Sequence, residues 1–181
     1  MVSSNSKCQN LLITYIEDFK RFDPVSGKLV EHHDPTFEKE WSYCTGYKRL
    51  LSCKKENWVF FHATNKKYHE RFITAYFKIV DVGLGKDIVP KYGIIGPASH
   101  AKNLDEHYVI VGDRQFSKKI REPGLKFDKT LAEKLEFNPP KKIPFTKGRS
   151  ELQCIASATM NIRFLTDNDV DTLFQEIKLL K

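Results

Sequence analysis

The feature that most constrains the fold is a long stretch, residues 71–82, in which apolar and polar side chains alternate. The apolar residues that share one face of this stretch are Ile73, Ala75, Phe77 and Ile79. Alternation with a period of two is typical of a strand that buries one face. Because several shorter strands accompany this long one, the sequence predicts a strongly bent sheet.

Four further segments have the composition of strands. They are residues 11–16, 58–62, 107–111 and 159–165, and the last of them alternates clearly. β-Branched and aromatic side chains, which are frequent in these segments, fit a pleated surface. Together the strands predict a small, strongly curved, mixed β-barrel of about five to six strands.

Helices are expected at three places. One covers residues 127–135, where apolar residues recur every four positions and Asp128 is the expected N-cap. The last begins after Thr166, with Asp169 at the capping-box position. A third is expected over residues 35–41. The predicted fold class is therefore α+β, with helices flanking the sheet.

Three stretches are expected to be irregular because they contain proline and glycine or several prolines. They are residues 21–34, 83–103 and 138–150. Long loops in a compact domain are often functional. Neither an internal repeat nor a domain boundary is evident, so we expect a single domain over residues 1–181.

The net charge of the chain comes from one segment, residues 114–149, which we call the basic segment. It holds eleven basic and four acidic residues, and this excess of +7 equals the net charge of the whole chain. Clustered cations are typical of proteins that bind polyanions, because binding to phosphates releases counterions. A solvated lysine-rich surface would have the same composition. The sequence therefore predicts nucleic-acid binding and leaves a plain charged surface as the alternative.

Several other classes of protein find little support in the sequence. The longest apolar runs are far too short to span a bilayer, and residues 1–10 lack the apolar core of a signal peptide, so we expect no membrane association and a cytoplasmic location. The cysteines form no CxxC pair and are expected to be free thiols; they are Cys8, Cys44, Cys53 and Cys154. We expect no metal site and no cofactor.

The sequence contains none of the catalytic motifs with a known mechanism that we sought. It lacks GxSxG, HExxH, a Walker loop and the zinc-deaminase pattern. We therefore expect a protein without catalytic activity. The alternative that stays open is a nucleotide-processing enzyme whose site is assembled from dispersed acids such as Asp18, Asp34 and Asp113.

Aromatic residues and cations are interleaved over residues 41–71. Aromatic rings stack on unpaired bases at roughly 1–3 kcal/mol each, and nearby cations hold the phosphates. Trp41 and Tyr43, in a loop-like context, are the expected ring contacts, with core packing as the alternative. Only alternate residues of 58–62 can face the interior, so one of its rings must point elsewhere. Residues 62–68 are expected to form a loop that contacts base edges and phosphates, although an ordinary hairpin loop would look similar.

The order of these segments resembles the PUA-like superfamily, which includes the EVE, ASCH and YTH domains. The resemblance rests on residues 10–18 (NLLITYIED), 54–61 (KKENWVFF), 73–80 (ITAYFKIV) and 163–166 (RFLT), the last of which leads into the C-terminal helix. It implies a small curved barrel that binds RNA or modified DNA and is not itself a catalyst. It also implies a role as the targeting domain of a modification-dependent restriction complex.

The resulting hypothesis is a nucleic-acid-binding module. Base contacts are expected from Trp41, Tyr43, His62, Thr64, Asn65 and Tyr68. Phosphate contacts are expected from Lys66, Lys67, Arg71, Lys118, Lys119, Arg121, Lys141, Lys142, Lys147 and Arg149, with Arg163 on the polar face of its strand as a further candidate. The other open class is a protein-interaction module that docks an acidic partner. The sequence does not separate RNA from DNA.

Overall fold

A computed structural model describes residues 9–16, 20–23, 28–31, 35–38, 40–94 and 104–180. The strands of its main sheet are β1 (Asn10–Thr14), β4 (Ser42–Thr45), β5 (Trp58–Asn65), β6 (Glu70–Leu84), β7 (Tyr108–Gly112), β8 (Lys118–Lys119), β9 (Leu125–Lys126) and β10 (Arg163–Leu165). A separate hairpin consists of β2 (Lys20–Asp23) and β3 (Lys28–Glu31). The helices are α1 (Gly85–Tyr92), α2 (Lys129–Lys134), α3 (Glu151–Thr159) and α4 (Asp167–Leu179), with a 3-10 turn, η1, at Lys48–Ser52.

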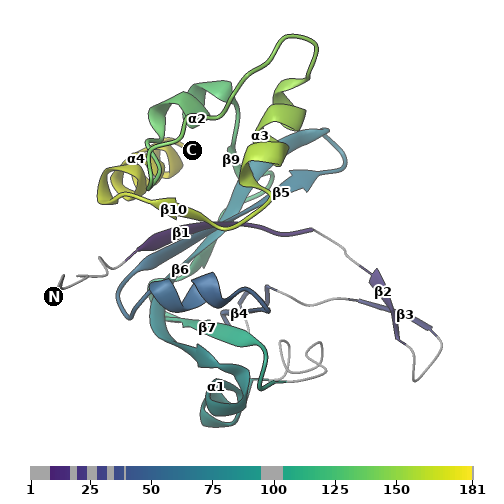
Figure 1. Cartoon of the computed structure of the whole chain (residues 1–181), viewed down its shortest axis with the longest axis vertical. Coiled ribbons are helices and arrows are strands. Elements are labelled where there is room, and N and C mark those ends of the chain that lie inside the picture. The colour runs from purple at the N-terminus through teal and green to yellow at the C-terminus, as the bar shows by residue number, and fades with distance from the viewer. Residues whose placement is uncertain are drawn as a thin grey trace, which may run out of the picture.

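The sheet is mixed and is organised around its longest strand, β6. The strand order is β10-β1-β5-β6-β7-β4, with β1 parallel to β5 and the other pairs antiparallel. The first half of β6 also pairs with β8 and β9, whereas its second half pairs with β7. Helices α2, α3 and α4 gather at one end of the molecule and α1 lies at the other (Figure 1). The predicted α+β class and the long central strand are confirmed.

Both faces of the sheet are buried. On one face, Leu12, Phe60 and Ile73 pack against helices α2, α3 and α4. On the other face, Phe61 and Phe77 belong to a second cluster that contains no residue of these helices. In β1 and β5, successive residues alternate between the two clusters, as the period of two requires. The predicted single apolar face of β6 was wrong at Ile73. The register between β5 and β6 shifts between Phe61 and His62, so Ile73 packs on the opposite face from Ala75, Phe77 and Ile79.

The sheet curls so strongly that distant strands touch across its inner face. The ring of Tyr43 in β4 lies 5.6 Å from that of Phe61 in β5, although β7 and β6 stand between these strands in the sheet. The two ends of the sheet approach each other as well, because Tyr47 after β4 and Ile162 before β10 line one pocket of about 280 Å³. No described residues pair β4 with β10. The expected closed barrel is therefore an open, curled sheet.

The two helices with predicted N-caps begin where the sequence placed them. The Asp128 carboxylate accepts a hydrogen bond from the Leu131 amide at the start of α2. Thr166 and Asp169 form a complete capping box at the start of α4. Such caps satisfy amides that have no partner inside the helix. Both helix predictions are confirmed, as is the irregular stretch of residues 138–150.

Several other sequence predictions were wrong. Residues 35–38 and 40–41 form no helix, and Thr36 instead makes an isolated bridge to Ser42. Residues 159–162 are not strand, because α3 runs to Thr159 behind a Ser150–Gln153 capping box and β10 starts only at Arg163. The expected loops at 21–34 and 83–103 contain the β2–β3 hairpin and α1.

Candidate nucleic-acid interface

Four aromatic rings pack together where β5 and β6 meet α4. The ring centroid of Phe174 lies 4.7 Å from that of Trp58, 5.1 Å from that of Tyr76 and 5.2 Å from that of Phe60. Phe60 is fully buried here, whereas Trp58 and Tyr76 are only half-buried. Burial raises the pKa of the Tyr76 phenol above its ordinary value, so its hydroxyl stays protonated at neutral pH. The strands thus present two partly exposed rings.

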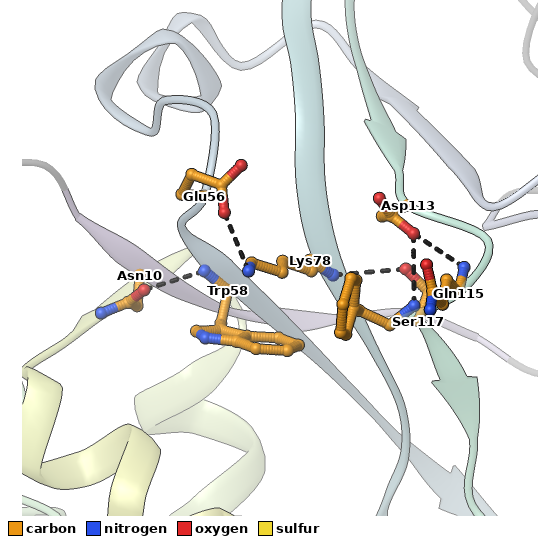
Figure 2. Close-up of polar contacts among 8 residues, drawn as sticks. Asn10, Glu56, Trp58, Lys78, Asp113, Gln115 and Ser117 are labelled. Carbon is orange, nitrogen blue, oxygen red and sulfur yellow. Dashed lines mark hydrogen bonds and ion pairs between the residues drawn. The ribbon is translucent and has the colours of Figure 1, made fainter.

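Lys78 lies beside these rings and links them to a further ring, that of Phe116. It pairs with Trp58 across β5 and β6, and its Nζ lies 5.8 Å from the centroid of the Trp58 ring. The same Nζ lies 4.8 Å from the centroid of the Phe116 ring and 2.8 Å from Oε2 of Glu56. A cation over an aromatic face is attracted by the ring quadrupole. Figure 2 shows Lys78 between Trp58 and the turn that carries Ser117.

That turn is shaped by a single carboxylate. Oδ1 of Asp113 accepts hydrogen bonds from the amides of Gln115, at 2.7 Å, and Phe116, at 3.3 Å. Oγ of Ser117 then accepts the amide of Lys78, at 3.2 Å, and ties the turn to β6. As a result Phe116 is held at the surface, where 49% of its area stays exposed.

One lysine of the basic segment borders these rings. In β8, Lys118 pairs with Tyr76 of β6, and side chains of directly paired residues lie on the same face of a sheet. Lys118 is exposed. The set Trp58, Tyr76, Lys78, Phe116 and Lys118, which we call the ring–lysine face, therefore combines exposed π-surface with cations.

Most cations of the basic segment have no carboxylate partner within the described ranges. Three of its eleven basic residues form ion pairs, which are Lys126–Glu70, Lys129–Glu133 and Lys134–Glu176. The other eight have no ion pair with any residue that the structure describes. The charge excess seen in the sequence is therefore available to a polyanion.

The sequence predicts that Trp41 and Tyr43 lie in a loop, but the structure places Tyr43 in a strand and Trp41 just before it, with both rings turned inward. Trp41 directly precedes β4 and is only 8% exposed, with its ring edge-on to that of Phe77 at 5.6 Å. Tyr43 lies within β4 and is half-buried against Phe61. Pairing of β4 with β7 turns both rings toward the inner core, so neither belongs to the ring–lysine face.

The predicted loop at residues 62–68 is mostly strand, because β5 continues to Asn65 and only a tight turn follows. His62 is fully buried and Thr64 and Asn65 are half-buried, whereas the turn exposes Lys66, Lys67 and Tyr68. Nζ of Lys67 lies 5.3 Å from the centroid of the Tyr68 ring. Arg71, an expected phosphate contact, is 6% exposed and lies inside the protein. Of the predicted loop at residues 62–68, only the turn at residues 66–68 is thus exposed.

Most of the other predicted phosphate contacts lie on the surface. Lys119, Arg121, Lys141, Lys142 and Lys147 are exposed. Arg149 is exposed and donates to Oγ of Ser157 at 2.6 Å. Arg163 is half-buried, with its guanidinium 4.9 Å from the centroid of the Phe137 ring and a hydrogen bond to the carbonyl of Lys141.

Trp58, Tyr76, Lys78 and Phe116 were missed by the sequence reasoning, which assigned Trp58 to the core. One usable signal was present, since the alternation of residues 58–62 turns Trp58 and Phe60 away from the inner core, and of these two rings only Trp58 is partly exposed. Phe116 stands inside the basic segment, next to Lys118 and Lys119. A ring between cations in a charged stretch is therefore a signal for exposed rings that the sequence analysis did not use.

No protein-family model, curated protein or solved structure matches this chain. Within the described ranges, no three His, Cys, Asp or Glu side chains are grouped so that they could hold a metal ion. Asp18 and Asp34, two of the dispersed acids considered above, lie outside the described residues, as does Cys8. No described helix has both the length and the apolar composition needed to cross a membrane.

Proposed function

We propose that this protein is a non-catalytic nucleic-acid-binding module and that the ring–lysine face is its contact surface. The observation that carries the proposal is the position of Phe116. This exposed ring belongs to the basic segment, and Lys78 lies over it at 4.8 Å. Stacking on a base and neutralisation of a phosphate can therefore occur at one place, which is how proteins hold single strands.

The charge distribution supports this use of the surface. Lys118 follows Phe116 by two residues, is exposed and has no ion pair with a described residue. A polyanion that binds here gains from counterion release without breaking an internal ion pair at this lysine. By contrast, Lys78 forms an ion pair with Glu56, so it contributes more to the position of the rings than to phosphate binding.

We also propose a PUA-like architecture, in keeping with the resemblance of the sequence segments. The strongly curled mixed sheet with flanking helices supports this assignment, and the open side between β4 and β10 is a difference from a closed barrel. Recognition of modified DNA, and service as the targeting domain of a modification-dependent restriction complex, rest on the resemblance alone.

The experiment that tests the proposal is a fluorescence anisotropy titration against four labelled ligands. These are single-stranded RNA, single-stranded DNA, plain duplex DNA and methylated duplex DNA, each at two salt concentrations. The proposal expects at least one ligand to bind and its affinity to fall with salt. Absence of binding to all four at low salt would contradict it and would favour the protein-interaction class.

A further inference from the structure

A second pocket lies away from the ring–lysine face, between the start of β6, β9 and the N-terminus of α3. Its volume is about 290 Å³. Phe127, Leu152 and Ile155 supply apolar lining, and Arg71 is the most deeply buried charged residue among those that line it. None of the interactions described for the ring–lysine face involves this pocket.

Arg71 is buried without a counter-charge from the described part of the chain. Its Nε donates to Nδ1 of His62 at 2.9 Å, and its Nη2 donates to Oγ1 of Thr14 at 3.2 Å. These bonds use two of the five N–H groups of a guanidinium. No carboxylate of the described residues lies within ion-pair distance of it. Burial lowers the Arg71 pKa to about 10, which still leaves the group charged at neutral pH. An unpaired buried charge is costly, so a partner from outside the chain would be favourable.

The N-terminus of α3 faces the same pocket. Oγ of Ser150 accepts the amide of Gln153, and the carbonyl of Ser150 accepts that of Cys154. The amides of Glu151 and Leu152, which also line the pocket, have no acceptor among the described residues. Free amides at a helix N-terminus, with the positive end of the helix dipole, favour an anion.

We propose that this pocket binds a singly charged oxyanion, held by the free N–H groups of Arg71 and by the amides of Glu151 and Leu152. A carboxylate and a phosphodiester share this chemistry. The restriction to a single charge follows from the acidic residues that also line the pocket, since they repel a more highly charged anion. These residues are Glu70, Asp128 and Glu151.

Each of those carboxylates already has a donor. Oε1 of Glu70 is 2.5 Å from Nζ of Lys126, and Oε1 of Glu151 accepts the amide of Lys129 at 2.8 Å. Oδ1 of Asp128 accepts the amide that it caps in α2. They therefore do not compete for the guanidinium of Arg71. Their negative charge only limits how much negative charge the bound anion can carry.

The test is a thermal melt of the full chain in sodium acetate or in sodium dimethyl phosphate, against sodium chloride at equal ionic strength. Because a ligand that binds only the folded state raises Tm, a saturating rise is expected in at least one of the two oxyanions. Acetate and dimethyl phosphate distinguish a carboxylate ligand from a phosphodiester. The variant Arg71→Met should lose the rise, whereas Arg121→Met, which removes the same charge from an exposed site, should keep it. No rise in the natural protein, or an equal rise in Arg71→Met, would overturn the proposal.

A second measurement does not depend on the variant folding. In ¹⁵N–¹H spectra of the natural protein, titration with the same two anions should move the amide signals of Glu151 and Leu152 most. Shifts that instead concentrate at Lys118 and Lys119 would overturn the pocket assignment. Neither result bears on nucleic-acid binding at the ring–lysine face, which the anisotropy titration tests separately.

Discussion

Nε of Arg71 donates a hydrogen bond of 2.9 Å to Nδ1 of the fully buried His62. A guanidinium can only donate, so Nδ1 must accept and the imidazole proton must lie on Nε2. Nε2 of His62 therefore donates to Oγ1 of Thr14, at 2.9 Å, and the Thr14 hydroxyl donates in turn to the carbonyl of Thr159, at 2.5 Å. This chain of bonds holds β1, β5, β6 and α3 together and requires a neutral His62.

The first prediction concerns pH. Burial, followed by the charge of Arg71, lowers the pKa of His62 well below its ordinary value of 6.5. The unfolded chain therefore takes up a proton below that pH while the folded chain does not, and the free energy of unfolding falls as pH drops, by about 1.4 kcal/mol per pH unit at most. Above pH 6.5 this contribution to stability is fully present.

Urea unfolding of the natural protein and of His62→Gln, at pH values on both sides of 6.5, measures this effect. Glutamine keeps a donor and an acceptor but does not titrate, so the variant should lose less stability on acidification. Equal acid sensitivity of the two proteins would show that His62 is protonated in the folded state as well.

The second prediction concerns Trp41, because the sequence and the structure give it different roles. Since its ring is buried against Phe77, Trp41→Ala should cost about 3–5 kcal/mol of folding free energy through weaker packing and a cavity. Chemical denaturation measures this cost. If Trp41→Ala kept its stability but bound base-containing ligands more weakly, Trp41 would instead contact the ligand, as the sequence analysis predicts.

The third prediction concerns Phe116. Phe116→Ala should leave stability nearly unchanged, because the ring is 49% exposed, but should weaken binding of single strands by roughly 1–3 kcal/mol per stacked base. An oligonucleotide with abasic sites provides the control, since it has phosphates but no base to stack. If the variant lost the same affinity for both oligonucleotides, the ring would not stack on a base.

The fourth prediction concerns the salt dependence of binding. Replacing Lys118 by Met should flatten the slope of log affinity against log salt by up to about 0.7–0.9 for each phosphate that this lysine neutralises. Lys91→Met in α1 removes a cation at the other end of the molecule and should leave the slope unchanged. A lower slope in Lys91→Met would point to nonspecific attraction by the net charge.

The sequence predicted those parts of the fold that depend on local patterns. The alternation of β6 from Ala75 to Ile79, the Asp128 cap and the Thr166–Asp169 capping box all rest on neighbours in the chain. However, Asp169 is also fully buried, and its carboxylate accepts the amides of Glu136 and Phe137 at 2.7 and 3.1 Å. No local pattern reveals that second function, because the partners are more than thirty residues away.

The candidate site was harder to predict for the same reason. Lys78 and Phe116 are far apart in sequence, and they meet only because β8 pairs with β6. Trp41 was expected to be accessible because a short polar stretch with glycine is typical of a loop, whereas its ring is buried against Phe77 just before β4 begins. The excess of cations in the basic segment could be recognised from the sequence, since charge can be counted without knowledge of the fold.

The most direct test of the proposed interface is a ¹⁵N–¹H titration with whichever of the four oligonucleotides binds most tightly. We predict that the largest shifts fall on the amides of residues 113–119, on the Trp58 indole and on residues 76–78. Shifts concentrated on α1 or on the β4–β7 pair, with the ring–lysine face unchanged, would contradict the proposed interface.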